Sequence, residues 1–260
     1  MKRVATALIL IPFIVWIVLW APVWAFDAVL VASGCIAFYE FDQIASRSVR
    51  GDFGKRHSVI PGMLAGLALL FAPQPFLIAI LIALAAMTMA LLSADLKISL
   101  PAASVFALGV LYIFGAWRCA VGLRGINPHW LMIALLISWA GDTAALYVGR
   151  AIGRRKMAPM ISPGKTWEGA AGSVAGAMTA AGMYGYFLIP SFPVWGVLGI
   201  AAVGNIAGQT GDLCESAFKR GAGVKDSGST LPGHGGWLDR IDSSLFTIPV
   251  VYAILSFFPF

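Results

Sequence analysis

The chain has 260 residues, of which 59% are hydrophobic and only 12% are charged. Soluble domains carry about 25% charged residues, so this composition excludes a soluble globular protein, and its hydrophobicity excludes a disordered one. Three cysteines are too few for a disulfide framework. The remaining class is a polytopic membrane protein, in which the net charge of +6 is informative mainly about topology.

Apolar stretches recur along the chain, and a helix that crosses a bilayer needs roughly 20 apolar residues. The sequence therefore predicts an all-α polytopic membrane protein with about nine transmembrane helices. The predicted spans are 4–23, 26–45, 59–73, 76–93, 101–118, 130–149, 169–189, 193–212 and 243–259.

The basic residues predict the orientation of these spans. If the N-terminus is cytoplasmic, all of the 18 Lys and Arg residues except Arg118 and Arg124 fall in cytoplasmic segments. This positive-inside bias places the C-terminus outside, on the periplasmic side. An alternative reading makes the first span a signal peptide, because Lys2 and Arg3 precede it and residues 23–25 could pass as a cleavage site.

Polar residues at membrane depth concentrate in the second half of the chain. We expect residues 1–130 to be a lipid-facing scaffold with possible dimer contacts, and residues 131–260 to be the catalytic region, with cytoplasmic loops 150–168 and 213–242. Asp142 lies inside the sixth span, where a charged side chain costs at least about 2.5–3.5 kcal/mol by insertion scales. Such a residue points to a functional role.

A polar stripe follows the eighth span and its cytoplasmic extension, at offsets of three and four residues: Asn205, Gln209, Asp212, Ser216 and Lys219. This spacing places the side chains on one helix face, which must point to a bundle interior or to water. Hydrogen bonding between helices is the alternative explanation, and it fits Asn205 and Gln209 equally well. Asp212 and Lys219 favour a binding site.

Asp239 and Asp242 are three residues apart at the start of the ninth span, on the same membrane side as Asp212. They could simply cap the helix N-terminus. Three carboxylates at one depth would repel one another unless a cation lay among them, and oxygen ligands suit Mg²⁺. Cys214 and His234 are too few for a zinc site.

Basic residues are interleaved with Gly, Ser and Thr in two cytoplasmic segments, 150–169 and 216–242. Attraction to anionic headgroups is the simplest explanation of such charge. Glycine-rich backbone also lets N–H groups approach phosphate oxygens, and lysine adds a positive charge. Neither segment has the spacing of a P-loop.

Residues 216–242, which we call the signature segment, read SAFKRGAGVKDSGSTLPGHGGWLDRID, and they closely resemble the signature of the phosphatidate cytidylyltransferases. The stretch from Gly141-Asp142-Thr143 to the run SPGKTWEG at 162–169 is also similar to that family. One departure is Arg154-Arg155-Lys156, where the family has a lysine-richer pattern, although the charge is kept. Residues 1–130 resemble the family only in hydropathy.

The resemblance implies a Mg²⁺-dependent transferase that condenses CTP with phosphatidic acid to CDP-diacylglycerol and pyrophosphate. It also implies a homodimer in a bacterial inner membrane, with the active site on the cytoplasmic side and no nucleic-acid partner. We expect Asp212 and Asp239, assisted by Asp242, to hold the metal. Asp142 could also bind the metal, hold a metal ligand in place, or pair with a cationic side chain.

Two further sets of residues are assigned on this basis. The predicted catalytic residues are Asp212, Lys219, Arg220, Lys225, Asp226, His234, Asp239 and Arg240. The predicted substrate-binding residues are Ser162, Lys165, Thr166, Ser216, Ser227, Asn205 and Gln209. For His234 a phosphate contact or backbone positioning is favoured over proton transfer. Trp167, Trp237 and Tyr147 could stack on cytosine, but an interfacial aromatic belt is the favoured explanation.

Three other functions compete with this one. A transporter or channel would use Asp142 and the polar stripe as a permeation path, but the sequence has no internal repeat. A CTP-dependent polyprenol or lipid kinase would need the same groups and would release CDP in place of pyrophosphate. An inactive scaffold is disfavoured by the intact carboxylates and cations.

Overall fold

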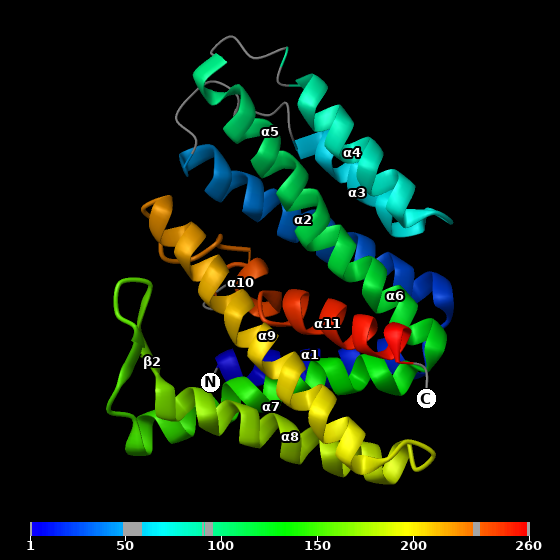
Figure 1. The fold of residues 1–260 in the computed structure, drawn as a ribbon, viewed down its shortest axis with the longest axis vertical. Helices are drawn as coiled ribbons and strands as arrows, with labels where there is room; N and C mark the ends of the chain where they lie inside the picture. Colours follow the sequence, from blue (N-terminus) through cyan, green and yellow to red (C-terminus); the bar gives the residue numbers. More distant parts are fainter. Residues whose placement is uncertain (1, 49–58, 90, 92–95, 231–234, 259–260) are drawn as a thin grey trace. The chain divides into compact units, whose positions relative to one another are not determined.

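A computed structural model describes residues 2–48, 59–89, 91, 96–230 and 235–258, and almost all of these residues are helical (Figure 1). The helices are α1 (Lys2–Leu19), α2 (Val23–Ser48), α3 (Val59–Phe71), α4 (Pro75–Met89), α5 (Leu96–Val110), α6 (Ala116–Ile126), α7 (Pro128–Ile152), α8 (Trp167–Leu188), α9 (Val194–Gly221), α10 (Leu238–Ile241) and α11 (Ser244–Phe257). A π-helical turn, Leu111–Gly115, joins α5 to α6.

Each predicted span coincides with one of these helical segments. Within the described part of the chain, four segments are long and apolar enough to cross a bilayer: Val23–Ser48, Leu96–Ile126, Pro128–Ile152 and Leu238–Phe257. Shorter apolar helices are Leu10–Leu19, Val59–Phe71 and Pro75–Thr88. The protein is therefore an α-helical membrane protein, while the number of crossings and their orientation remain predictions.

The contacts between residues divide the chain into two compact units. Unit 1 consists mainly of Val23–Arg118 and Phe218–Arg240, and unit 2 of Val4–Pro22, Cys119–Ala217 and Ile241–Phe260. Both units thus combine early and late parts of the sequence. The predicted division into a scaffold (residues 1–130) and a catalytic region (residues 131–260) is based on where polar residues lie in the sequence. It remains a prediction.

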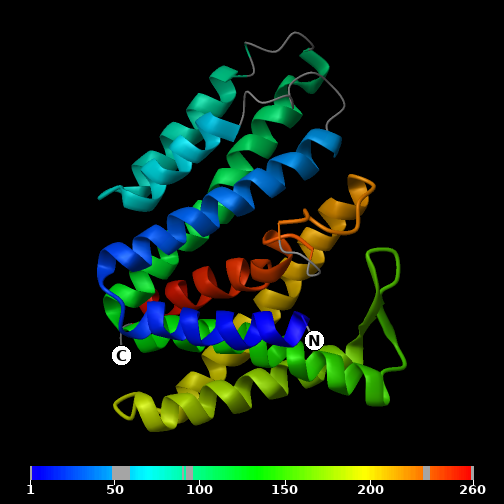
Figure 2. The same ribbon diagram turned by 180° about the vertical axis from the view of Figure 1, so that it is seen from behind.

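In unit 1, α2 packs with α3 and α5, and α3 and α4 lie side by side in both ribbon views (Figures 1 and 2). Aromatic side chains fill the interior: the ring centroids of Phe38 and Phe114 are 6.0 Å apart. The end of α9 belongs to this unit, because Phe218 packs edge-on against Phe41 of α2. The signature segment is therefore anchored to an N-terminal helix.

In unit 2, α7 and α8 form a close pair (Figure 1). A Cβ atom on Gly172 would lie 2.6 Å from Val148, and one on Gly176 would lie 2.4 Å from Ala144. Small residues let the two backbones approach each other this closely. On the other side of α7, Ser138 Oγ lies 3.2 Å from Thr247 Oγ1 of α11.

The connection between α7 and α8 is a β-hairpin, which differs from the expected all-α fold. Strand β1 (Lys156–Ala158) pairs antiparallel with β2 (Ser162–Thr166), and Lys156 lies opposite Thr166. The reversal between the strands falls at residues 159–161, and it begins at Pro159, a residue that favours turns. Loop 150–168 is therefore largely ordered, and the first nine residues of the expected loop 213–242 extend α9.

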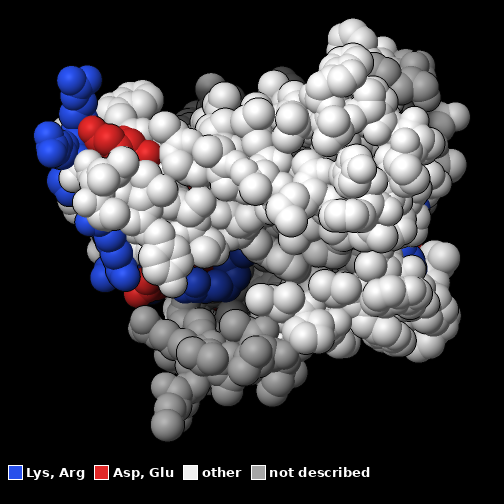
Figure 3. All heavy atoms as spheres, turned by 90° about the horizontal axis from the view of Figure 1, so that it is seen from below, with Lys and Arg blue, Asp and Glu red and all other residues white. Residues whose placement is uncertain are grey.

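Large apolar side chains remain exposed on the helices, as lipid-facing surfaces require. On α4, for example, Phe76 is 80% and Leu84 is 53% exposed. Figure 3 shows one face on which charged side chains gather along one side and the remainder is mostly uncharged. Large exposed apolar side chains such as those of α4 mark surfaces that contact lipid or another protein.

Candidate active site

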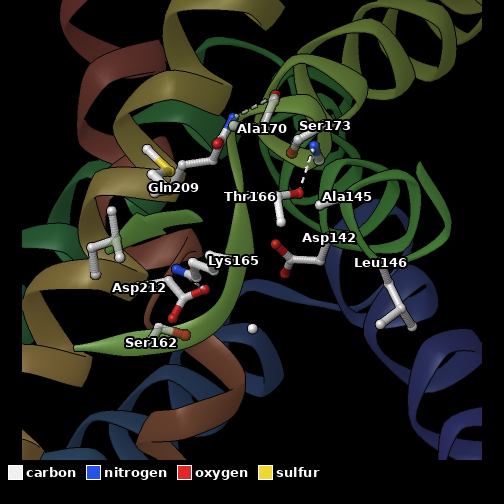
Figure 4. Close-up of a pocket in the computed structure, with 14 residues that line it drawn as sticks. Asp142, Ala145, Leu146, Ser162, Lys165, Thr166, Ala170, Ser173, Gln209 and Asp212 are labelled. Carbon is white, nitrogen blue, oxygen red and sulfur yellow. Dashed lines mark hydrogen bonds and ion pairs between the residues drawn. The ribbon is translucent and has the colours of Figure 1, made fainter. Parts of the chain in front are cut away.

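A cavity of about 330 Å³ opens in unit 2 among α7, α8, α9 and the hairpin (Figure 4). Its polar wall includes Asp142, Lys165, Asp212 and Gln209, and its apolar wall includes Leu146 and other aliphatic side chains. The cavity thus offers charged groups and apolar surface side by side. This combination suits a charged group attached to an apolar chain.

The cavity contains an ion pair between β2 and α9. Lys165 Nζ lies 2.7 Å from Asp212 Oδ2, and the two side chains are 25% and 32% exposed. Asp142 of α7 points into the same cavity (Figure 4), where it interacts electrostatically with both partners. The hairpin is what carries Lys165 to the two carboxylates.

Two more acidic residues of unit 2 belong to the same electrostatic cluster. Asp242 is buried and interacts with the charges of Asp212, Glu215 and Asp142. Its Oδ1 accepts a hydrogen bond of 2.6 Å from the backbone N–H of Ser243. Glu215 is also buried, with 1% of its surface exposed. Across the described residues, no three His, Cys, Asp or Glu side chains are placed to hold one metal ion together.

Asn205 and Gln209 connect α9 to its neighbours. Asn205 Nδ2 donates to the carbonyl oxygen of Ile137 on α7, at 3.3 Å. Gln209 Nε2 donates to Ala170 O on α8, at 3.3 Å, and to Asn205 Oδ1, at 2.7 Å. These are the bonds that the interhelical alternative predicts. Their role in substrate binding remains a prediction.

A second charged site lies in unit 1, within the signature segment. Lys219 Nζ lies 2.5 Å from Asp239 Oδ1, and the two side chains are only 10% and 9% exposed. Asp239 Oδ2 also accepts hydrogen bonds from the backbone N–H groups of Ser227, at 3.0 Å, and Gly236, at 2.9 Å. Because a buried carboxylate needs such partners, these contacts fix the loop around Asp239.

The remaining predicted site residues are placed as follows. Ser162 lines the unit 2 cavity, as does Thr166, whose Oγ1 accepts from Gly169 N at 3.1 Å and caps α8. Ser216 Oγ lies 3.4 Å from Asp212 Oδ1, and Arg220 Nη1 donates to Val224 O at 3.3 Å. Lys225, Asp226 and Arg240 are exposed, and His234 lies outside the described residues.

The structure thus gathers Asp142, Lys165, Asp212 and Asp242 in one unit, and Lys219, Ser227 and Asp239 in the other. Sequence reasoning missed Glu215 and also Glu40, a buried carboxylate on α2. The argument that singled out Asp142 would have found Glu40, because it is an acidic residue inside a predicted span.

Clustered carboxylates and lysines next to apolar surface define a class of protein, the membrane-bound enzymes that handle phosphate groups. The comparison with known proteins specifies the class further. The chain belongs to the cytidylyltransferase family, which it matches over residues 1–258. It is therefore an enzyme of the nucleotidyltransferase class, active in phospholipid biosynthesis.

Two curated relatives carry the same name. The chain is 36% identical over 206 residues to a phosphatidate cytidylyltransferase of Staphylococcus aureus (strain COL), a match that covers 75% of this chain and 79% of the relative. It is 39% identical over 154 residues to a phosphatidate cytidylyltransferase of Bacillus subtilis (strain 168), covering 58% and 57% of the two chains.

Proposed function

We propose that this protein transfers the cytidylyl group of CTP to phosphatidic acid, forming CDP-diacylglycerol and releasing pyrophosphate. The observation that carries the proposal is the unit 2 cavity, in which Asp142, Asp212 and Lys165 lie beside an apolar wall. An amphiphilic phosphate substrate needs both surfaces. The names of the relatives identify the substrates by analogy.

The reaction needs little acid–base assistance from the protein. A phosphate oxygen of phosphatidic acid attacks the α-phosphorus of CTP, and the bond to the β-phosphate oxygen breaks as pyrophosphate leaves. The second pKa of a phosphomonoester is about 6, so the attacking oxygen is already anionic near neutral pH. The main barrier is the repulsion between two polyanions, which positive groups must offset.

The acidic side chains of unit 2 have the donor chemistry of a divalent-cation site, because carboxylate oxygens are the ligands that Mg²⁺ prefers. No three of the described ones are placed to hold one ion together, and Lys165 pairs with one of them, Asp212. Asp212, Asp142 and Asp242 would supply the ligands if a bound ion drew them together, while Asp239 of unit 1 is paired with Lys219. When bound, Mg²⁺ would neutralise charge on the CTP phosphates and on the leaving pyrophosphate.

The protein's own cations would complete this neutralisation. Lys165 stands in the unit 2 cavity, where its ammonium group can exchange Asp212 for a substrate phosphate. We assign Lys225 and Arg220 of the signature segment to phosphate binding, because both belong to its exposed basic stretch. Lys219 is engaged with Asp239, so we assign it to holding that carboxylate in place.

The proposal includes the topology and the assembly. Nine spans, a cytoplasmic N-terminus and a periplasmic C-terminus would place both charged sites at the cytoplasmic face of a bacterial inner membrane. A homodimer is the proposed assembly. Labelling of single cysteines introduced at 156 and 225 from either side of the membrane tests the orientation, and native mass spectrometry in detergent tests the dimer.

The direct test of activity is to incubate the purified full-length chain with labelled CTP, phosphatidic acid and Mg²⁺. The expected products are CDP-diacylglycerol and pyrophosphate in equal amounts. Release of CDP together with a phosphorylated lipid would instead identify the kinase. Solute flux in liposomes without consumption of CTP would identify the transporter.

A further inference from the structure

Glu40 of α2 is a buried carboxylate to which the proposed mechanism assigns no role, and it is 2% exposed. It accepts four hydrogen bonds from the signature segment. Oε1 accepts from the hydroxyl of Thr230, at 2.5 Å, and from the backbone N–H of Trp237, at 2.9 Å. Oε2 accepts from the hydroxyl of Ser227 and the backbone N–H of Leu238, both at 2.8 Å.

These four donors come from both ends of one loop. Ser227 and Thr230 lie at its beginning, and Trp237 and Leu238 lie at its end. Each oxygen of Glu40 therefore joins one hydroxyl from the first end to one backbone N–H from the other. Hydrogen bonds to an ionised acceptor are about twice as strong as neutral ones, so one side chain closes the loop from both sides.

The loop sequence is adapted to this carboxylate. A Cβ atom on Gly228 would lie 2.7 Å from Glu40 Oε1, and one on Gly236 would lie 2.5 Å from Oε2. At both positions only glycine allows the carboxylate to approach the backbone so closely. The indole Nε1 of Trp237 adds a further bond to α2, of 2.8 Å to Ser33 Oγ.

The residues that Glu40 holds also shape the charged part of the segment. The backbone N–H groups of Ser227 and Gly236 donate to Asp239. Ser227 is also bound to Glu40 through its hydroxyl, and Gly236 directly precedes Trp237, which is bound to Glu40 through its backbone N–H. A cavity of about 250 Å³ lies where this loop faces α2, lined by Asp226 and Ser227 and by Gln43 and Arg47, one and two turns beyond Glu40. Its shape depends on the distance between α2 and the loop.

We propose that Glu40 is a positioning residue for cytidylyl transfer. Its carboxylate holds the signature segment against α2, and so fixes the orientation of Asp239 and the shape of the cavity beside Arg47. This inference rests on the proposed function, because it assumes that the signature segment binds the reacting phosphates. It also assigns the N-terminal region a part in the reaction, beyond that of a scaffold.

The test is Glu40→Gln in the full-length chain, with Asp27→Asn as the matched control on the same helix. The amide nitrogen of Gln would face one hydroxyl, which can turn and accept from it, and one backbone N–H, which cannot, so at least one of the four bonds is lost. We expect kcat/KM for CTP, measured per folded molecule, to fall at least about tenfold, with a small fall in the melting temperature. Asp27→Asn should match the wild type. Glu40→Asp, which keeps both acceptor oxygens, should recover part of the loss.

Hydrogen exchange separates positioning from a general structural role. In Glu40→Gln the amides of Trp237 and Leu238 should exchange faster, while those of α3 and α5 keep wild-type rates. Wild-type kcat/KM in folded Glu40→Gln, or faster exchange throughout unit 1 with wild-type turnover per folded molecule, would overturn the inference. If Glu40→Gln does not fold, Thr230→Val removes one of the four donors instead, and kcat/KM should fall about threefold. An unchanged kcat/KM in Thr230→Val would then overturn the inference.

Failure of this inference is distinguishable from failure of the proposed function. A wild-type protein that forms no CDP-diacylglycerol refutes the proposed function, whatever Glu40→Gln does. A wild-type protein that forms it at the same rate as folded Glu40→Gln refutes only the role of Glu40.

Discussion

Lys165 Nζ lies 2.7 Å from Asp212 Oδ2, so the second strand of a short β-hairpin, near its junction with α8, is joined to the long helix α9. The two residues are 47 positions apart in the sequence, and each lines the same cavity. A partly exposed ion pair of this kind contributes little to stability. The presence of this pair in the cavity is better explained by substrate binding, because either partner can be exchanged for a phosphate or a cation.

Replacing Lys165 tests this explanation. Lys165→Met removes the ammonium group from the cavity and leaves a side chain of similar length, so phosphate charge there is no longer offset. We expect kcat/KM to fall at least about tenfold, which corresponds to about 1.4 kcal/mol. Lys156→Met is the control, because Lys156 is an exposed lysine of the same hairpin. Equal losses in both variants would show that the hairpin acts only through its overall charge.

The acidic cluster of unit 2 should determine how much Mg²⁺ the enzyme needs for activity. Removing divalent ions with a chelator should abolish turnover, and added Mg²⁺ should restore it. Asp212→Asn and Asp142→Asn each remove one carboxylate charge from the cavity, so the Mg²⁺ concentration for half-maximal activity should rise about tenfold or more. Asp27→Asn should leave it unchanged. An unaltered Mg²⁺ requirement in both cavity variants would contradict the metal assignment.

The close packing of α7 and α8 predicts a stability effect. Gly172→Ala places a methyl group 2.6 Å from the branched side chain of Val148, and overpacking of this kind costs about 1–3 kcal/mol. Gly199→Ala on α9 meets no atom within 4 Å and should stabilise the helix by roughly 0.5–1 kcal/mol. Thermal unfolding in detergent should therefore shift in opposite directions for the two variants. A shift of the same sign in both would rule out this packing.

Glu168 predicts a pH-dependent hairpin. Its carboxylate accepts from the backbone N–H groups of Arg154, at 3.0 Å, and Arg155, at 3.2 Å. These bonds, chiefly that from Arg154, lower the pKa of Glu168. Since the folded pKa is lowered, the stabilisation is complete above the ordinary value of about 4.3 and is lost as the pH falls through the lowered pKa.

The amide NMR signals of Arg154 and Arg155 can follow this titration. Their shifts should move with a midpoint below about 4.3, the ordinary glutamate value, and Glu168→Gln should remove the transition. A midpoint at or above the ordinary value would mean that the carboxylate does not hold the hairpin.

Local pattern was sufficient to predict much of the protein. Apolar runs located a helix at each of the nine predicted spans, because a bilayer-crossing helix must be apolar along its length. The cost of charge at membrane depth identified Asp142 and Asp212, and both line the unit 2 cavity. The small residues of α8 are typical of close helix packing, and in the structure Gly172 and Gly176 lie against Val148 and Ala144 of α7.

Only the tertiary structure showed which distant segments of the chain contact each other. The hairpin that carries Lys165, and the contact of Glu40 with residues 187 to 198 positions later, depend on pairings between distant parts of the chain. Hydropathy and spacing describe one helix at a time, so they identify which faces are polar without indicating the partner of each face. For this reason the sequence by itself determined the class of protein and its charged groups, whereas only the folded chain showed that α2, an apparent scaffold helix, holds the signature segment.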